Sequence, residues 1–118
     1  MQNSLDQYLK CQKELYDRDS MVFDAGFIVY KLFEDKSIYL HLLYIEEDKR
    51  TQGLGTRLTD QLLAHTKAET AYSYIDTTTK NPETSLLAHL MYGFKIYSIE
   101  GNSINLIYKK QPKEKGEL

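Results

Sequence analysis

The sequence predicts an α/β (α+β) domain in which a mixed sheet is flanked by helices. Segments with helical spacing of apolar residues alternate with segments rich in Val, Ile, Phe and Tyr, in the order α-β-β-α-β-α-β-β. The chain has 118 residues, enough for one domain that buries about two-thirds of its surface without needing a disulfide or a metal. We expect this domain to span 1–110 and to be followed by a flexible charged tail at 111–118.

Two of the three expected helices have recognisable ends. A helix over 4–17 begins with Ser4 and Gln7, which form a capping-box pair. The last helix begins after Asn81 as its N-cap and ends before Gly93. The apolar stripe of this last helix is Leu86, Leu87, Leu90 and Met91, and that of the middle helix is Leu54, Leu58, Leu62 and Leu63.

The expected strands are rich in β-branched and aromatic residues. Met21 to Phe33 is interpreted as one strand with a bulge or bend at Gly26. The segment 38–45 is apolar on both faces, which is typical of a central strand covered on both sides. Further strands are expected at 72–76, 94–99 and 104–108, and the last two form a hairpin.

Composition excludes several classes of protein. The formal net charge of −2 argues against binding to nucleic-acid phosphates. No apolar stretch approaches the ~18 residues of a membrane span. Cys11 has no partner for an intramolecular disulfide, so we expect a cytoplasmic protein in which Cys11 is a small buried residue. The histidines and Cys11 lack metal-ligand spacing, so no metal is expected.

The turn from Arg50 to Arg57 carries the strongest local signal. Gly53 and Gly55 let the backbone pass close to a ligand, and the following helix N-terminus attracts anions. The run lacks the lysine of a Walker A loop and the third glycine of a dinucleotide fingerprint. Taken alone, the two glycines are equally consistent with a tight strand-to-helix turn.

Its surroundings distinguish these alternatives. The pattern Arg50-x-x-Gly53-x-Gly55 follows a strand with Leu43 and Ile45 and precedes an apolar helix. Tyr92-Gly93-Phe94 closes a later helix. Together, over about 26–108, these features resemble the acyl-CoA loop and the later helix end of the GNAT N-acetyltransferase superfamily. The resemblance implies the fold of that family, with a mostly antiparallel sheet.

The resemblance also implies that this chain uses acetyl-CoA as a co-substrate. Backbone N–H groups of the loop would bind the pyrophosphate, Arg50 would shape the turn, and the strand at Leu43 would bind the pantetheine arm. Asn81 would contact the coenzyme, although a helix cap alone also accounts for it. The implied coenzyme-binding residues are Leu43, Tyr44, Ile45, Arg50, Thr51, Gln52, Gly53, Leu54, Gly55, Thr56, Arg57 and Asn81.

The implied reaction is direct attack of a primary amine on the acetyl thioester. Most of an amine with a pKa of about 10.4 is protonated at pH 7, so a general base is needed. His41 is the best candidate, and Tyr39 shares its face by the two-residue period of a strand. A partly buried histidine held by a hydrogen bond is the alternative. A strand N–H near Leu43–Ile45 would bind the oxyanion, where a bulge would splay the parallel strands.

The proton for the leaving thiolate has no clear source. Most relatives place a tyrosine five residues before the helix-closing phenylalanine, and here that position is His89. His89 as a cation, Tyr92 or water could supply the proton. Tyr92 is also consistent with a core residue.

Two classes of function therefore remain: an active N-acetyltransferase, or an inactive acyl-CoA-binding or protein-interaction module on the same fold. The part of the chain before Met21 is short compared with relatives, where this region walls the acceptor site. We expect either an acceptor site open to a large substrate or a homodimer that completes it. Tyrosines on the expected strands, available for an aromatic pocket or for packing, are Tyr30, Tyr39, Tyr72, Tyr74 and Tyr97.

Overall fold

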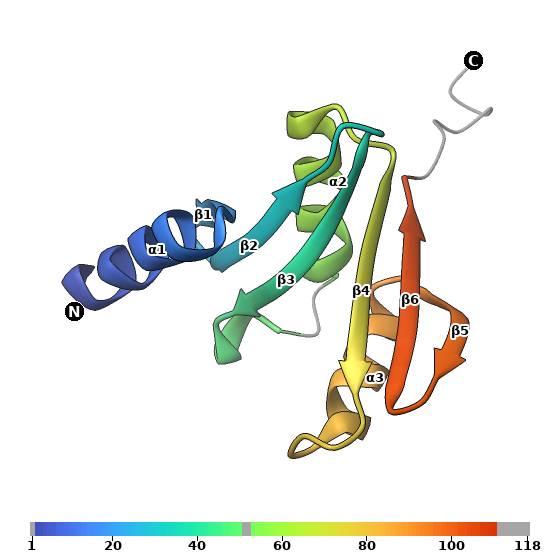
Figure 1. Ribbon diagram of the computed structural model, residues 1–118. Helices are drawn as coiled ribbons and strands as arrows, with labels where there is room; N and C mark the ends of the chain where they lie inside the picture. The colour runs from blue at the N-terminus through green and yellow to red at the C-terminus, as the bar shows by residue number, and fades with distance from the viewer. Residues whose placement is uncertain (1, 51–52, 111–118) are drawn as a thin grey trace.

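The computed structural model describes residues 2–50 and 53–110, with side chains from Ser4 onward. Three α-helices and six strands follow one another along the chain (Figure 1). In order they are α1 (Gln2–Tyr16), β1 (Asp19–Phe23), β2 (Gly26–Leu32), β3 (Ser37–Ile45), the short 3-10 helix η1 (Glu47–Lys49), α2 (Leu54–Thr66), β4 (Thr70–Asp76), α3 (Pro82–Met91), β5 (Lys95–Glu100) and β6 (Ser103–Lys109).

All six strands form a single sheet in the order β1-β2-β3-β4-β6-β5. Neighbouring strands are antiparallel except for β3 and β4, which are parallel because α2 connects them. Helices α2 and α3 lie behind the sheet in Figure 1. Helix α1 packs beside β1 and β2 on the other face, where the rings of Tyr8 and Phe27 meet with centroids 6.3 Å apart. The expected mixed, mostly antiparallel sheet flanked by helices is confirmed.

The core lies between the sheet and α2. Leu58, Leu62 and Leu63 of α2 are buried in the core against β3 and β4, as the predicted stripe requires, and Leu54 is half-buried at the helix start. The helix ends at Thr66, where Lys67 takes a left-handed conformation with a φ of 62°. Tyr108 of β6 is anchored to the same helix, because its hydroxyl donates to Asp60 Oδ1 at 2.7 Å.

The segment 21–33 forms two strands rather than one. β1 and β2 form an antiparallel hairpin with Phe23 opposite Gly26. Gly26 begins β2, and a Cβ there would overlap the carbonyl oxygen of Tyr44 in β3. Gly26 is therefore the first residue of β2, and not a bulge or bend within one long strand as predicted. The β-rich composition of 21–33 concealed the turn because Asp24 and Ala25 do not form a strong turn sequence.

Three smaller predictions about the helices are wrong. Helix α1 begins at Gln2, so Ser4 lies inside it and cannot be its N-cap. Cys11 is exposed because it lies on the outer side of α1. The stripe of α3 is mostly exposed, with Leu87 55% and Met91 72% accessible, because the sheet-facing side of α3 lines a cavity. No helix within the described ranges is long and apolar enough to cross a membrane.

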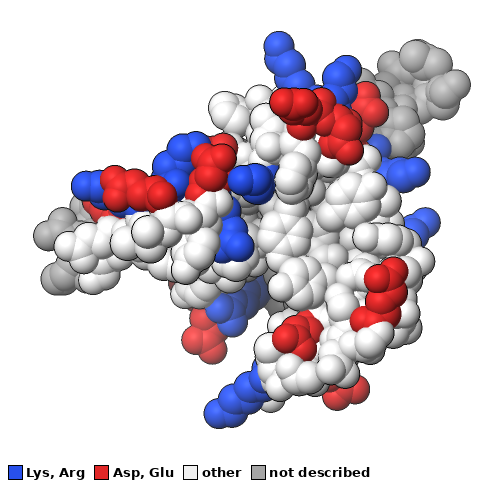
Figure 2. Space-filling model, viewed as in Figure 1, with Lys and Arg blue, Asp and Glu red and all other residues white. Residues whose placement is uncertain are grey.

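The sheet face opposite α2 and α3 carries several tyrosines. Within the described residues this face has no helix over β4, β6 and β5, and Figure 2 shows that its surface there is largely uncharged. Tyr39 stacks on Tyr74 with ring centroids 5.9 Å apart, and Tyr72 meets Tyr97 edge-to-face at 5.8 Å. These tyrosines pack on one another along the surface of the sheet.

Candidate functional site

The site begins at a bulge in β3. Leu42 lies opposite Val29 of β2 and Leu40 lies opposite Tyr30, so His41 between them is the extra residue. An extra residue reverses the alternation of side chains, and as a result Leu40 and Leu43 both pack toward the core with α2. The predicted bulge exists, but it lies two residues before the expected segment 43–45.

Beyond this point β3 and β4 separate. Their parallel ladder pairs only 37–39 with 70–72, and Figure 1 shows the two strands diverging toward α3. A cavity of about 250 Å³ fills the space between the separated strands and α3. Its lining includes His41 and Leu43 from β3, Ser73 from β4, and His89 and Tyr92 from the end of α3. The two histidines proposed from the sequence therefore lie in the same cavity.

A second cavity of about 290 Å³ lies at the glycine turn. Ala88 and Tyr92 line both cavities, so the two spaces meet at the end of α3. Six of the predicted coenzyme-binding residues line this second cavity: Ile45, Arg50, Gly53, Leu54, Gly55 and Thr56.

The turn at this cavity fits an anion. Gly53 is the N-cap of α2 with a φ of 76°, and no side chain caps the helix. The N–H groups of the first helical turn, from Leu54 to Thr56, therefore have no partner within the helix, and they carry the positive end of its dipole. A Cβ at Gly53 would have no atom within 4 Å, so space for a ligand is open beside it.

Arg50 fixes the start of this turn. Its Nε donates to the carbonyl oxygen of Ile45 at 2.7 Å, and its guanidinium lies 5.6 Å from the ring centroid of Tyr44. The role expected for Arg50, shaping the turn, agrees with these contacts. Arg57 is exposed on α2. Thr51 and Gln52, also proposed as coenzyme-binding residues, lie outside the described residues.

Gly55 allows close packing, a role that its sequence context did not predict. A Cβ at Gly55 would overlap the ring of Tyr92. Thr56 joins the same contact, because its Oγ1 donates to the carbonyl oxygen of Tyr92 at 2.9 Å. The start of α2 and the end of α3 are thereby held together, and Tyr92 packs against the core while it also forms part of both cavity walls.

We expect Gly55→Ala to destabilise the protein by about 1–3 kcal/mol, because the added methyl group displaces the Tyr92 ring. Tyr92→Ala removes that overlap, so the two substitutions should be non-additive. Gly55→Ala should therefore cost less in the Tyr92→Ala background than alone. Chemical denaturation of the wild type, both single variants and the double variant measures this coupling, and strictly additive costs would contradict the contact.

His41 is half-buried and held by an arginine. Arg18 Nη1 lies 3.2 Å from His41 Nε2, and the same Nη1 donates to Gln12 Oε1 at 3.0 Å. Because a guanidinium only donates, Nε2 accepts and the proton of the neutral ring is on Nδ1. Burial and, second, the charge of Arg18 lower the pKa of His41 below its usual 6.5. His41 is therefore neutral at pH 7.

Tyr39 is close to this pair but does not line the cavity. Its ring lies 6.3 Å from that of His41, centroid to centroid, and stacks on Tyr74. Burial, and then the neighbouring Tyr74, raise the pKa of Tyr39 to about 12, while the charge of Arg18 lowers it. Tyr39 is therefore a neutral phenol at pH 7, which can donate a hydrogen bond.

His89 has a different environment. Its Nδ1 lies 2.8 Å from the carbonyl oxygen of Ser85 and donates to it, while Nε2 lies 3.0 Å from Ser73 Oγ. Its ring meets Phe94 edge-to-face at 5.1 Å. Burial lowers the pKa of His89 despite the opposing bond to Ser85. Both ring nitrogens are therefore occupied in the neutral form, which disfavours a role as a cationic acid.

These properties predict a pH-dependent stability. The pKa of His89 in the folded protein lies below 6.5, its ordinary value in an unfolded chain. At a pH between these two pKa values, the unfolded chain therefore binds more protons than the folded protein. The contribution of His89 to the free energy of unfolding is therefore fully present above the unfolded pKa, and it is lost as pH falls through the folded pKa. We expect His89→Gln to reduce the slope of Tm against pH between about pH 7.5 and 5. The remaining slope belongs to His41, and an unchanged slope would contradict the burial of His89.

Asn81 is at the predicted N-cap position but does not cap α3. Its backbone is left-handed, with a φ of 58°, and its side chain makes no capping hydrogen bond. A capping residue normally has an extended backbone that directs its side chain at the first turn, and a left-handed one does not. Asn81 is not among the described residues that line either cavity. Its contact with a coenzyme stays a prediction.

Four residues near the site were not predicted from the sequence to take part in it. Arg18 contacts His41 from 23 positions away, and no local pattern indicates such a contact. Ser73 and Ser85 form hydrogen bonds with His89. They lie in ordinary strand and helix sequences, which give no sign of these contacts. Lys49 lines the loop cavity and pairs with Glu46 at 3.5 Å. Across 2–50 and 53–110, His, Cys, Asp and Glu side chains form no group of three or more that could hold a metal ion.

The chain shares its fold with several solved structures that are described as acetyltransferases. A GNAT-family protein from Bacteroides thetaiotaomicron is 14% identical with a TM-score of 0.61, covering 96% of this chain and 73% of that one. The Campylobacter jejuni N-acetyltransferase PseH in complex with acetyl coenzyme A is 17% identical with a TM-score of 0.60, covering 94% and 83%. A GNAT family acetyltransferase from Elizabethkingia anophelis with acetyl-CoA bound is 15% identical with a TM-score of 0.56, covering 92% and 83%.

At these identities the structures show a shared fold. No curated protein sequence matches the chain. The family model "Acetyltransferase (GNAT) family" matches residues 24–94, which is more than half of the chain and includes β2, β3, the glycine turn, α2, β4 and α3. The match includes both cavities and the resemblance first seen at Gly53 and Gly55, and the chain therefore belongs to the GNAT acetyltransferase family.

Proposed function

We propose that this protein is an N-acetyltransferase that moves the acetyl group of acetyl-CoA to a primary amine. The observation that carries the proposal is the continuity of the site. An anion-binding turn at Gly53 opens into a cavity that meets, at Tyr92, the space between the separated strands where His41 lies. The fold matches solved structures that contain CoA or acetyl-CoA, such as PseH from Campylobacter jejuni.

The residues of the turn are suited to the coenzyme. The free N–H groups from Leu54 to Thr56 and the open space at Gly53 would bind its pyrophosphate. The edge of β3 that faces β4 has no ladder partner beyond Tyr39 among the described pairs, so its backbone groups toward Ile45 are available to the pantetheine arm and to the acyl carbonyl. The coenzyme supplies an activated thioester.

His41 is the proposed general base. Deprotonating an amine with a pKa of about 10.4 at pH 7 costs roughly 4–5 kcal/mol. Once Arg18 Nη1 no longer donates to it, Nε2 of neutral His41 accepts this proton as the amine nitrogen bonds to the acyl carbon and the carbon–sulfur bond breaks. The thiolate released has an ordinary pKa of about 8.5, so water suffices to protonate it. This step requires no acid from His89, which agrees with its neutral, fully bonded ring.

The test is turnover on a panel of amines with acetyl-CoA. Thiol release should require both acetyl-CoA and the amine, and mass spectrometry should find an acetylated product. Cys11 is exposed and would react with thiol reagents, so Cys11→Ser is the appropriate background for this assay. Coenzyme binding without turnover on any amine, peptide or protein would instead support an inactive acyl-CoA-binding or protein-interaction module.

Assembly and location stay predictions. A homodimer is the arrangement in which a second copy completes the acceptor site, and sedimentation of the full chain with and without coenzyme tests it. A cytoplasmic location is proposed from the single cysteine and is tested by fractionating cells that express the protein.

A further inference from the structure

Arg18 is held beside the site by uncharged partners. It follows α1 and precedes β1, and its guanidinium carbon lies 4.9 Å from the ring centroid of Tyr16. Its Nη1 contacts Gln12 Oε1 and His41 Nε2, at 3.0 Å and 3.2 Å. Gln12 is 8% exposed, so it is a fixed partner. The guanidinium therefore has a defined position at the cavity wall formed by His41.

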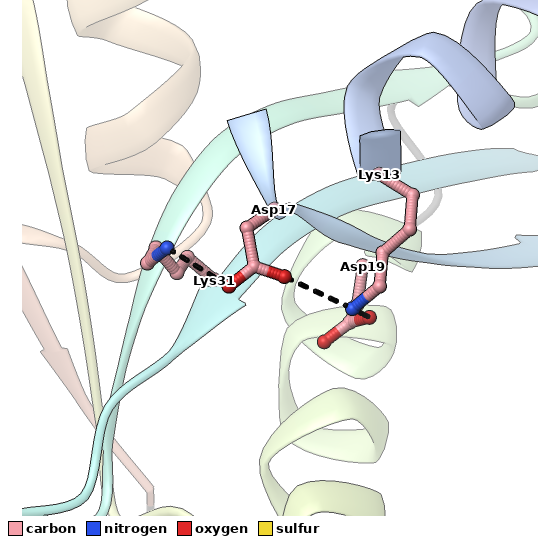
Figure 3. Close-up of polar contacts among 4 residues, drawn as sticks. All are labelled: Lys13, Asp17, Asp19 and Lys31. Carbon is pink, nitrogen blue, oxygen red and sulfur yellow. Dashed lines mark hydrogen bonds and ion pairs between the residues drawn. The ribbon is translucent and has the colours of Figure 1, made fainter. Parts of the chain in front are cut away.

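The two carboxylates adjacent to Arg18 in sequence are bound by lysines. Asp17 pairs with Lys13 at 3.2 Å and with Lys31 at 3.4 Å, and Asp19 pairs with Lys13 at 2.9 Å. Figure 3 shows this network, in which both carboxylates are directed at lysine nitrogens. Within residues 2–50 and 53–110, no carboxylate forms an ion pair with Arg18.

Most of the hydrogen-bonding capacity of Arg18 remains. A guanidinium has five N–H donors, and the contacts to Gln12 and His41 both use Nη1. The described part of the chain contains no buried side-chain nitrogen without a partner, so Nε and Nη2 reach solvent. This fork of parallel donors is the group that binds a carboxylate in bidentate fashion.

We propose that Arg18 binds a carboxylate of the acceptor, and that the acceptors are α-amino carboxylates such as free amino acids. This inference rests on the proposed function, because it places the attacking amine at His41. It adds a substrate class and a specificity-determining residue to that function.

The short distance between Arg18 and His41 decides the class of acceptor. Because Nη1 of Arg18 is 3.2 Å from Nε2 of His41, an amine at the base and a carboxylate on the arginine are separated by only a few atoms. An α-amino acid meets this condition. A lysine side chain within a protein does not, because it has only methylene groups beside its amine, and the N-terminus of a peptide does not, because it has an uncharged amide where the carboxylate would be.

Binding of the carboxylate also weakens the hydrogen bond that Arg18 donates to His41. The lone pair on Nε2 accepts from Arg18 when no acceptor is bound. A carboxylate on the guanidinium competes for its donors and partly neutralises its charge, and both effects leave Nε2 more available to take the proton of the amine. Recognition of the acceptor and availability of the base are thereby linked.

The experiment compares common L-amino acids with the matching amino amides as acceptors for acetyl-CoA. The amine of an amide is less basic and so more of it is neutral at pH 7, which means that a preference for the acid cannot come from the amine. We expect kcat/KM to favour the acids in the wild type. Arg18→Gln should reduce that preference by about 10- to 100-fold, mainly through KM, because a charge-assisted contact is lost. Arg18→Lys should retain part of it.

The ratio between acid and amide isolates what depends on the carboxylate, namely its contact with Arg18 and the release of His41 that follows from this contact, because an effect of the substitution on folding applies to both acceptors equally. Equal kcat/KM for both acceptors, or a ratio that Arg18→Gln leaves unchanged, would overturn the inference while leaving the acetyltransferase proposal intact. If no amine is acetylated, that proposal fails separately. Calorimetric titration of the CoA-loaded protein with amino acids then decides the inference: binding that Arg18→Gln removes supports it, and no binding, or equal binding of amides, overturns it.

Discussion

Gly53→Glu is expected to weaken acetyl-CoA binding by about 100-fold, which corresponds to about 2.7 kcal/mol. The wild-type glycine has a φ of 76° and open space around it at the start of α2. The new side chain would occupy that space and place a negative charge where the helix N-terminus and the free N–H groups attract the pyrophosphate. Calorimetry or fluorescence titration with acetyl-CoA and with CoA measures the loss.

Gly101→Glu is the matched control for this prediction. Gly101 has a φ of 58° in the turn between β5 and β6, and a Cβ there would also have no atom within 4 Å. Both variants therefore experience the same kind of backbone strain and the same change of charge. Only the variant at Gly53 should lose coenzyme affinity. Similar affinities for the two variants would remove the assignment of the turn as the pyrophosphate site.

His41→Ala is expected to lower kcat by about 10²- to 10⁴-fold and to leave acetyl-CoA affinity unchanged, because the base is lost and the turn is not. In the wild type, kcat should rise with pH as His41 loses its proton. This rise lies below the usual histidine pKa of 6.5, because burial and Arg18 disfavour the cation. The rise should be absent from the pH profile of the variant.

His65→Ala is the control for the loss of a histidine. His65 is exposed in the last turn of α2 and lines neither cavity among the described residues. Its replacement should leave both kcat and the pH profile unchanged. An unaltered profile in His41→Ala would assign the base to another group or to water, and Tyr39, which lies beside His41, would be the next residue to replace.

The helices and strands could largely be predicted because hydrophobic periodicity is a local property of the chain. The stripe of α2 and the central strand β3 lie where the pattern placed them. The stripe of α3 was misjudged, because apolar spacing shows that a helix has an apolar side and does not show that anything covers it. In the fold, Ala88 and His89 face the cavity while Met91 is mostly exposed.

The bulge at His41 shows why the site could be predicted only in part. A two-residue period through β3 places Tyr39, Leu43 and His41 on one face. The extra residue moves Leu43 to the core side while Tyr39 stacks on Tyr74 at the sheet surface. Register depends on the partner strand β2 as much as on β3, so the sequence of β3 alone does not determine which of its residues is extra.

The sequence by itself determined the fold class, the glycine turn at the start of α2 and the resemblance to the GNAT family, because hydrophobic periodicity and short motifs can be recognised without knowing which segments pack together. The turn requires a left-handed residue before a helix, and Gly53 supplies it. The tertiary structure decided the chemistry around the histidines. Arg18 reaches His41 and Ser73 reaches His89 only after β3 and β4 separate and α1 and α3 pack beside them. These contacts depend on packing between distant segments, and local patterns carry no information about them.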